Sequence, residues 1–236
     1  MSRRVVIIGA GITGSLVAWR LARAGWQVTV VEARHVGAGS SSRTAAGIRQ
    51  QFSTPETVLG MRFSVDFYRR FREEVGGESV PIVQNGYLFL HALQEEWDAA
   101  RRRVVMQHEA GLTEVEALEA PDLARRFRWV DPHAVLGGTW CPTDGFLRPE
   151  TVYNEAIAAA RALGALVVQS APVTGHVAGP DGRIDAVLTP KGPFAADMSS
   201  TPPTPGPRAS PPSSAPSSCP SPRASATSGC SSAAAP

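Results

Sequence analysis

The chain has 236 residues, of which 43% are apolar, enough to bury a sizeable core. Its formal net charge of +2 provides no strongly basic field, so we expect no nucleic-acid partner. No stretch approaches the ~20 apolar residues that cross a bilayer, so we expect no membrane span. Residues 1–4 could begin a signal peptide, but glycines interrupt the apolar stretch that follows. Export is therefore not expected, and we predict a cytoplasmic protein.

Residues 4–34 read as an apolar strand, a glycine-rich turn, a helix and a second apolar strand. The turn is the run GAGITG at residues 9–14. Gly9 permits a tight turn, Gly11 lets the backbone approach a pyrophosphate, and Gly14 lets the helix pack close to the strands. In this context the glycine run indicates a dinucleotide site, which the bare motif alone would not.

The residues that follow the turn predict where each part of the nucleotide binds. Ile12 and Thr13 begin the helix, whose free N–H groups and partial positive charge favour phosphate. Glu32 follows Gly14 by 18 residues and can accept hydrogen bonds from ribose hydroxyls. An acid there repels a 2′-phosphate, which disfavours NADP. An ADP-containing dinucleotide is the prediction, and a glycine-rich turn that binds nothing is the alternative.

The next segments are a polar loop and a long amphipathic helix. Residues 37–47 are small and polar and offer several backbone N–H groups to an anion. Thr54 is expected to cap a helix that begins at Pro55. Apolar residues then recur at helical spacing and should be buried: Val58, Met61, Val65, Tyr68, Phe71 and Val75.

The remaining apolar segments alternate between strands and helices up to a composition break near Asp197. Gly164 is expected to end the last helix in a left-handed conformation. The strand that follows, 165–168, is expected to rejoin the parallel sheet. The other expected elements are strands at 87–90 and 135–142, helices at 94–110, 120–127 and 149–163, and a hairpin of 173–177 with 183–188 around a turn at 179–182.

Cysteine and histidine spacing supports neither a disulfide framework nor a metal site. Cys141, Cys219 and Cys230 form no C-x-x-C pair, and two of them lie in a low-complexity tail. The five histidines are scattered without the spacing of metal ligands. We therefore expect no metal.

The tail from Ser199 onward has no Leu, Ile, Val, aromatic or acidic residue and is predicted to be disordered. A Pro-rich ligand for a peptide-binding module is one alternative. A slip of one or two bases in the gene just after the Asp197 codon is another. A shifted frame can encode Val-Val-Asn-Ala-Ala-Asp-Pro-Trp-Ala, which reads as a buried strand and a turn. A gene with no long open shifted frame would exclude it.

Several segments together resemble the D-amino-acid oxidase-like FAD-dependent oxidoreductases, in the branch of sarcosine oxidase beta-subunit, glycine oxidase and dimethylglycine dehydrogenase. The resemblance covers roughly residues 3–197. The Ser/Arg/Gly-rich stretch at residues 39–52, called the second segment below, is more specific than the glycine turn and favours FAD over NAD. An NAD-binding module or another flavin class, such as a hydroxylase, remains the alternative. The matching segments are 9–14 with 32–34, GSSSRTAAGIRQQF at 39–52, QNGYLF at 84–89 and PTDGFLRP at 142–149.

The resemblance assigns candidate cofactor contacts. Gly9, Gly11 and Gly14 would surround the pyrophosphate, and Glu32 would hold the ribose. In the same comparison the residues expected at the adenine, phosphate, ribityl and flavin positions are Ala33, Arg34, Ser41, Ser42, Arg43, Ala46, Gly47 and Val173.

The resemblance also implies the chemistry. A hydride would leave the carbon of a small amine or amino acid for the flavin, and the resulting imine would hydrolyse. Arg49 is the candidate catalytic residue, because a cation there could stabilise the anionic reduced flavin or hold a substrate carboxylate. A structural ion pair is the alternative for Arg49. The sequence identifies neither the electron acceptor nor whether the chain has partner subunits.

We predict an α/β fold in which a Rossmann-like FAD-binding domain with a parallel sheet carries an inserted α+β substrate domain. Family members continue beyond this point, so the chain is expected to lack part of its FAD site and pocket, which leaves a truncated, inactive product as the alternative. The predicted divisions are 1–78 and 148–197 for the FAD-binding domain, 79–147 for the substrate domain and 198–236 for the disordered tail.

Overall fold

The computed structural model describes residues 3–179 and 183–200. Its first sheet is parallel throughout, with the strand order β13-β1-β2-β9. The register pairs Val5 with Val28 and Val30 with Val167, so β-branched side chains line up across the sheet. This confirms the α/β fold and the return of the chain to the parallel sheet near residue 166. The strands are β1 (Arg4–Ile8), β2 (Gln27–Val31), β9 (Leu166–Val168) and β13 (Met198–Ser200).

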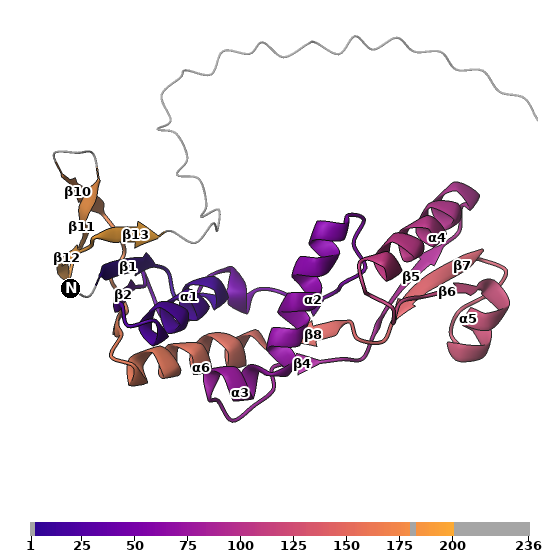
Figure 1. Cartoon of the computed structure of the whole chain (residues 1–236), viewed down its shortest axis with the longest axis horizontal. Coiled ribbons are helices and arrows are strands. Elements are labelled where there is room, and N and C mark those ends of the chain that lie inside the picture. Colours follow the sequence, from indigo (N-terminus) through magenta and orange to yellow (C-terminus); the bar gives the residue numbers. More distant parts are fainter. Residues whose placement is uncertain (1–2, 180–182, 201–236) are drawn as a thin grey trace, which may run out of the picture. The chain divides into compact units, whose positions relative to one another are not determined.

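Two helices from distant parts of the chain, α1 (Ile12–Arg23) and α6 (Pro149–Ala162), run side by side (Figure 1). Ala18, Ala156 and Ala160 are fully buried, and such small side chains let the two helices approach closely. The predicted left-handed residue after α6 is confirmed, because Gly164 has φ +93°.

The predicted helix after Thr54 is two helices, α2 (Pro55–Arg69) and α3 (Phe71–Val75). The expectation of one continuous helix is wrong at Arg70, where ψ is 13°; its guanidinium bridges Asp66 and Glu74 across the break at 2.8 and 3.0 Å. Thr54 occupies the N-cap position, but its hydroxyl contacts the Thr57 hydroxyl at 2.8 Å instead of capping an N–H. Of the apolar positions, four are buried and two partly buried: Val58, Val65, Phe71 and Val75, then Met61 and Tyr68.

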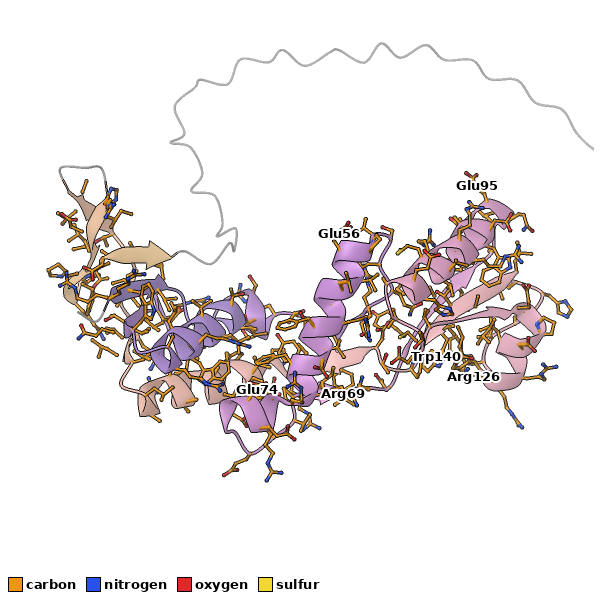
Figure 2. The ribbon with its side chains drawn as sticks, viewed as in Figure 1. Glu56, Arg69, Glu74, Glu95, Arg126 and Trp140 are labelled. Carbon is orange, nitrogen blue, oxygen red and sulfur yellow. The ribbon has the colours of Figure 1, made fainter. Side chains whose placement is uncertain are left out.

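An antiparallel sheet of order β5-β7-β6 carries a helix on each face. On one face the Arg126 guanidinium of α5 lies 5.5 Å from the Trp140 ring centroid (Figure 2). Thr139 points to the opposite face, which α4 covers. Strand β6 was not predicted from the sequence. The elements are β5 (Tyr87–His91), α4 (Gln94–Glu109), β6 (Glu116–Glu119), α5 (Ala120–Arg126) and β7 (Gly137–Cys141).

Two further sheets are short. One has the order β3-β8-β4 and pairs Gly47 with Phe146. The other, β10-β11-β12, contains the predicted hairpin, whose turn at 180–182 lies outside the described residues. The elements are β3 (Gly47–Ile48), β4 (Ile82–Val83), β8 (Gly145–Leu147), β10 (Gly175–Ala178), β11 (Ile184–Thr189) and β12 (Gly192–Ala195).

Strand β13 corrects the predicted start of the disordered tail. Residues 198–200 pair in parallel with β1, with Met198 opposite Val5. Composition missed this strand because a ladder of backbone hydrogen bonds does not require apolar side chains. Residues 201–236 lie outside the described residues, and the domain divisions stay predictions.

Within the described residues, no helix combines the length and apolarity needed to cross a bilayer. The same part of the chain contains no group of three His, Cys, Asp or Glu side chains placed to hold a metal ion.

Candidate functional site

The turn after β1 requires glycine at its first and last positions, Gly9 and Gly14. Gly9 has φ +101°, and its N–H donates to the Val31 carbonyl at 2.8 Å, which ties the turn to β2. A Cβ on Gly14 would lie 2.0 Å from the Gly9 carbonyl oxygen. The helix therefore starts against the turn itself, with its first N–H groups at the carboxyl edge of the sheet.

The N-terminus of α1 is prepared for an anion. Its own first turn contains no acidic residue that would compete for its free N–H groups. The Ile12 N–H donates to Ser41 Oγ at 3.0 Å, which brings the second predicted segment onto the start of α1. Thr13 lies in the same turn. The structure thus brings together residues that the resemblance assigned to phosphate contact.

Glu32, at the end of β2, has its carboxylate fixed beside the turn. One oxygen accepts the Ala10 N–H at 2.8 Å and the other accepts the Arg34 N–H at 3.0 Å. Each carboxylate oxygen retains a second acceptor site for a sugar hydroxyl. The Ser170 and Ala171 N–H groups donate to the carbonyls of Arg34 and Glu32 at 2.8 and 2.9 Å, which brings the segment leading to Val173 beside them.

Around this carboxylate, Ala33 and Arg34 are exposed, and the Arg34 guanidinium donates to the Ala38 carbonyl. Val173 is 38% exposed, so it can offer backbone and side chain to a flat ring. These three residues and Glu32 occupy the end of the sheet where the adenine and its ribose are expected.

The second segment provides hydroxyls, a cation and a strained turn. Ser42 Oγ donates to the Gly39 carbonyl at 3.3 Å, and Arg43 is exposed with no carboxylate partner among the described residues. Ala46 has φ +53°, uncommon for a residue with a side chain, and its N–H donates to Thr44 Oγ1 at 2.9 Å. Gly47 follows as the exposed first residue of β3, where its backbone is open to a ligand.

Arg49 is held by aromatic rings. Its guanidinium carbon lies 5.0 Å from the Phe52 ring centroid and 5.6 Å from that of Phe89. In the described part of the chain no carboxylate pairs with it, so the alternative of a structural ion pair is not observed there. Its charge remains available to an anion.

Asp144 is a buried carboxylate that sequence reasoning did not single out. Its Oδ1 accepts the backbone N–H of Gln50 at 2.8 Å and the Gln50 Nε2 at 3.2 Å, and its Oδ2 accepts Gln51 Nε2 at 3.1 Å. Burial raises the pKa of Asp144, and these hydrogen bonds oppose the rise. The only sequence signal was the segment PTDGFLRP, 94 residues away from Gln50.

Cys141 is the buried free cysteine of the described chain, with Sγ 3.2 Å from Thr143 Oγ1. Burial raises its pKa to about 11, so the thiol stays protonated near neutral pH and is a poor nucleophile. Cys219 and Cys230 lie outside the described residues.

The residues present fit the ADP half of FAD. The α1 N-terminus, whose N-cap residue offers no side-chain cap, lies where the pyrophosphate is expected, and a fixed carboxylate lies at the end of the next strand, where the ribose is expected. Ser41 lies between the glycine turn and the second segment, where it can contact phosphate. This donor and acceptor set matches a doubly charged pyrophosphate joined to a sugar diol.

Comparison with known proteins finds relatives that are named as oxidoreductases or dehydrogenases. The curated FAD-dependent oxidoreductase domain-containing protein 1 homolog of Drosophila melanogaster is 34% identical over 168 residues, 68% of this chain and 32% of that protein. Mitochondrial dimethylglycine dehydrogenase of Mus musculus is 31% identical over 194 residues, 81% of this chain and 22% of that protein. The chain therefore spans about a third or less of these curated relatives.

Solved structures give the same fold. L-proline dehydrogenase from P. horikoshii superposes with a TM-score of 0.77 at 30% identity, over 85% of this chain and 52% of that one. Glycine oxidase from Geobacillus kaustophilus superposes with a TM-score of 0.71 over 85% of this chain and 55% of that one; at 24% identity it shows the fold alone.

The family model described as FAD dependent oxidoreductase, DAO, matches residues 4–209. This confirms the resemblance drawn from the glycine turn and the second segment, and FAD, the cofactor expected from the sequence, is the cofactor of that family. The chain belongs to the DAO family of FAD-dependent oxidoreductases.

Proposed function

We propose that this chain binds FAD at the carboxyl edge of its parallel sheet and oxidises the CH–NH bond of a small amine or amino acid. The observation that carries the FAD site is the convergence of Glu32, Ser41 and the glycine turn on the start of α1. Membership of the DAO family supports the redox chemistry. One relative is named for dimethylglycine, a tertiary amine, and one solved structure for L-proline, a secondary amine; both names support an amine beside a carboxylate as the substrate.

Each part of FAD would be bound by groups of complementary charge. The N–H groups of α1 and the Ser41 hydroxyl would hold the pyrophosphate, and Glu32 would hold the ribose. Bound FAD would supply the acceptor for the hydride that leaves the substrate carbon. Arg49 is exposed and pairs with no carboxylate among the described residues, and its charge would stabilise negative charge on the flavin or the substrate carboxylate.

The function is tested with the full chain. Purified protein is titrated with FAD and, separately, with NADH, and binding is followed by flavin fluorescence and by thermal shift. The FAD-loaded protein is then mixed anaerobically with sarcosine, glycine, D-alanine or L-proline, and bleaching of the flavin absorbance is recorded. Bleaching by one of these compounds supports the proposal. Stabilisation by NADH but not by FAD would contradict the cofactor assignment.

Glu32→Ala is expected to weaken FAD binding by about ten- to a hundredfold, because charge-assisted hydrogen bonds contribute about 1.5–3 kcal/mol each. The replacement also leaves the Ala10 N–H without the acceptor it has at 2.8 Å. Flavin fluorescence titration measures the dissociation constant. The matched control is Glu56→Ala, at an exposed position on α2 (Figure 2), which should bind FAD as the parent does. Equal affinity of the Glu32 and Glu56 variants would exclude the ribose role.

Arg49→Gln is expected to slow flavin bleaching by substrate about tenfold or more while changing FAD affinity little, because the lost cation acts on developing charge. Stopped-flow absorbance gives the bleaching rate and fluorescence titration gives the FAD affinity. Arg69→Gln, an exposed arginine on α2 (Figure 2), is the control. An unchanged bleaching rate in Arg49→Gln would remove Arg49 from the reaction.

A further inference from the structure

A pocket lies between α6, α3 with the residues that follow it, and the C-terminal half of α1. Figure 1 shows α1 and α3 next to α6. The pocket has a volume of about 620 Å³, and pockets of about 300–1,000 Å³ hold drug-sized ligands. None of its lining residues is among those expected to contact FAD or the substrate.

Most of the apolar lining comes from one face of α6. Three alanines of this helix follow Glu155 by three, four and seven residues, a spacing that places them on the same face as the glutamate. Ala158 and Ala162 are exposed, so this face is open to a ligand. The apolar lining residues are Trp19, Val75, Ala158, Ala159, Ala162 and Leu163.

Glu155 brings an uncompensated carboxylate to this lining. Its Oε2 is buried and has no hydrogen-bond partner among the described residues. Gly77 lies against that oxygen, because a Cβ on Gly77 would coincide with it. A carboxylate that is partly removed from water costs free energy unless a cation or a donor compensates it. That compensation is left to come from the pocket, which Glu155 lines.

The charged side chains of the lining are all acidic. Glu78 is exposed and Glu155 is partly buried, and no basic residue lines the pocket. Within residues 3–179 and 183–200 neither carboxylate forms an ion pair. Beside apolar walls these carboxylates attract a cation more strongly than they would in water. An amino acid would bring its own carboxylate toward both glutamates and is disfavoured by repulsion.

We propose that this pocket binds an apolar organic cation, with an ammonium or amidinium group on a hydrocarbon body and no carboxylate. The cationic N–H groups would donate to Glu155, and the charge of Glu78 would add to the attraction. The hydrocarbon would lie along the alanine face of α6 and against Trp19, where it is removed from water. This ligand differs from the amino-acid substrate proposed above, and the site does not depend on FAD.

Matched probes separate the charge from the apolar body. Isothermal titration calorimetry of the full chain, without FAD, would use benzamidine and hexylammonium, their neutral counterparts benzamide and hexanol, and ethylammonium. At least one of the two larger cations is expected to bind. Its neutral counterpart should bind about tenfold more weakly, because it cannot form the charge-assisted hydrogen bond. Ethylammonium should also bind about tenfold more weakly, because it buries less apolar surface.

Three outcomes would overturn the proposal. The first is that neither larger cation binds. The second is that the neutral counterpart binds as tightly as the cation, which would mean that the carboxylate is not used. The third is that ethylammonium binds as tightly as the larger cations, which would mean that the apolar face of α6 is not used.

Glu155→Gln is the diagnostic variant, because it removes the charge and keeps the size of the side chain. It should weaken binding of the better cation about tenfold or more and leave the FAD titration unchanged. The matched control is Glu150→Gln, at an exposed position on the same helix that does not line the pocket. Equal cation affinity in the two variants would overturn the site.

Ala158→Leu tests the apolar half without changing any charge. A larger side chain at this exposed position would occupy part of the pocket and should weaken binding of the better cation about tenfold. Thermal unfolding checks that all three variants fold. Unchanged affinity in Ala158→Leu would place the ligand elsewhere and overturn the site. Failure of the parent chain to bind FAD would count against the proposed function alone.

Discussion

Gly14→Ala is expected to abolish FAD binding and to lower the free energy of unfolding by about 3 kcal/mol. The added Cβ would lie 2.0 Å from the Gly9 carbonyl oxygen, so α1 must move away from the turn that positions it. The two atoms that the added Cβ would meet most closely are backbone atoms of Gly9, so no side chain can rotate away to make room. Urea unfolding and flavin fluorescence titration measure the two effects.

The control for Gly14→Ala is the same replacement at Gly60, in helix α2. A Cβ there meets no atom within 4 Å, so alanine should be neutral or stabilise the helix by up to about 1 kcal/mol. FAD binding should not change. A Gly14→Ala protein that is as stable as Gly60→Ala and still binds FAD would show that close packing of α1 on the turn is not required.

Asp144→Ala is expected to destabilise the protein by about 3 kcal/mol, because it removes the acceptor of three N–H groups, two in buried bonds from Gln50 and one in a part-buried bond from Gln51. Chemical denaturation gives the magnitude. Asp98→Ala is the control: Asp98 pairs with Arg101 at 2.7 Å on the surface of α4, where solvent screening leaves such a pair with little effect on stability. Equal losses in the two variants would mean that the buried network adds no stability.

The effect of Asp144→Ala should also depend on pH. Because burial raises the pKa of Asp144, the folded protein binds this proton more tightly than the unfolded chain does. The contribution of the carboxyl to stability is then greatest below its unfolded pKa and falls as the pH rises through the folded pKa. The stability difference between parent and variant should grow as the pH is lowered from about 7 toward about 4.5. A difference that shrinks on acidification would contradict the buried-carboxyl assignment.

Local signals predicted the parallel sheet and its nucleotide edge well. Strands of Val and Ile, the glycine turn and Gly164 are determined by backbone conformation and by side-chain shape within a few residues. The prediction failed at β13, because that strand forms by pairing with the distant β1. It also missed the helix break at Arg70, although the guanidinium bridges Asp66 and Glu74, which each lie four residues away along the chain.

The candidate site divides in the same way. The sequence by itself determined the family, the cofactor class and the residues expected around pyrophosphate and ribose, because those contacts come from one continuous βαβ unit and one following loop. Only the tertiary structure decided that Asp144 fixes Gln50 and Gln51 across 94 residues, and that Trp19, Glu78 and Glu155 line one pocket. Hydrogen bonds and charges act between atoms that folding brings together, and no spacing along the chain encodes those distances.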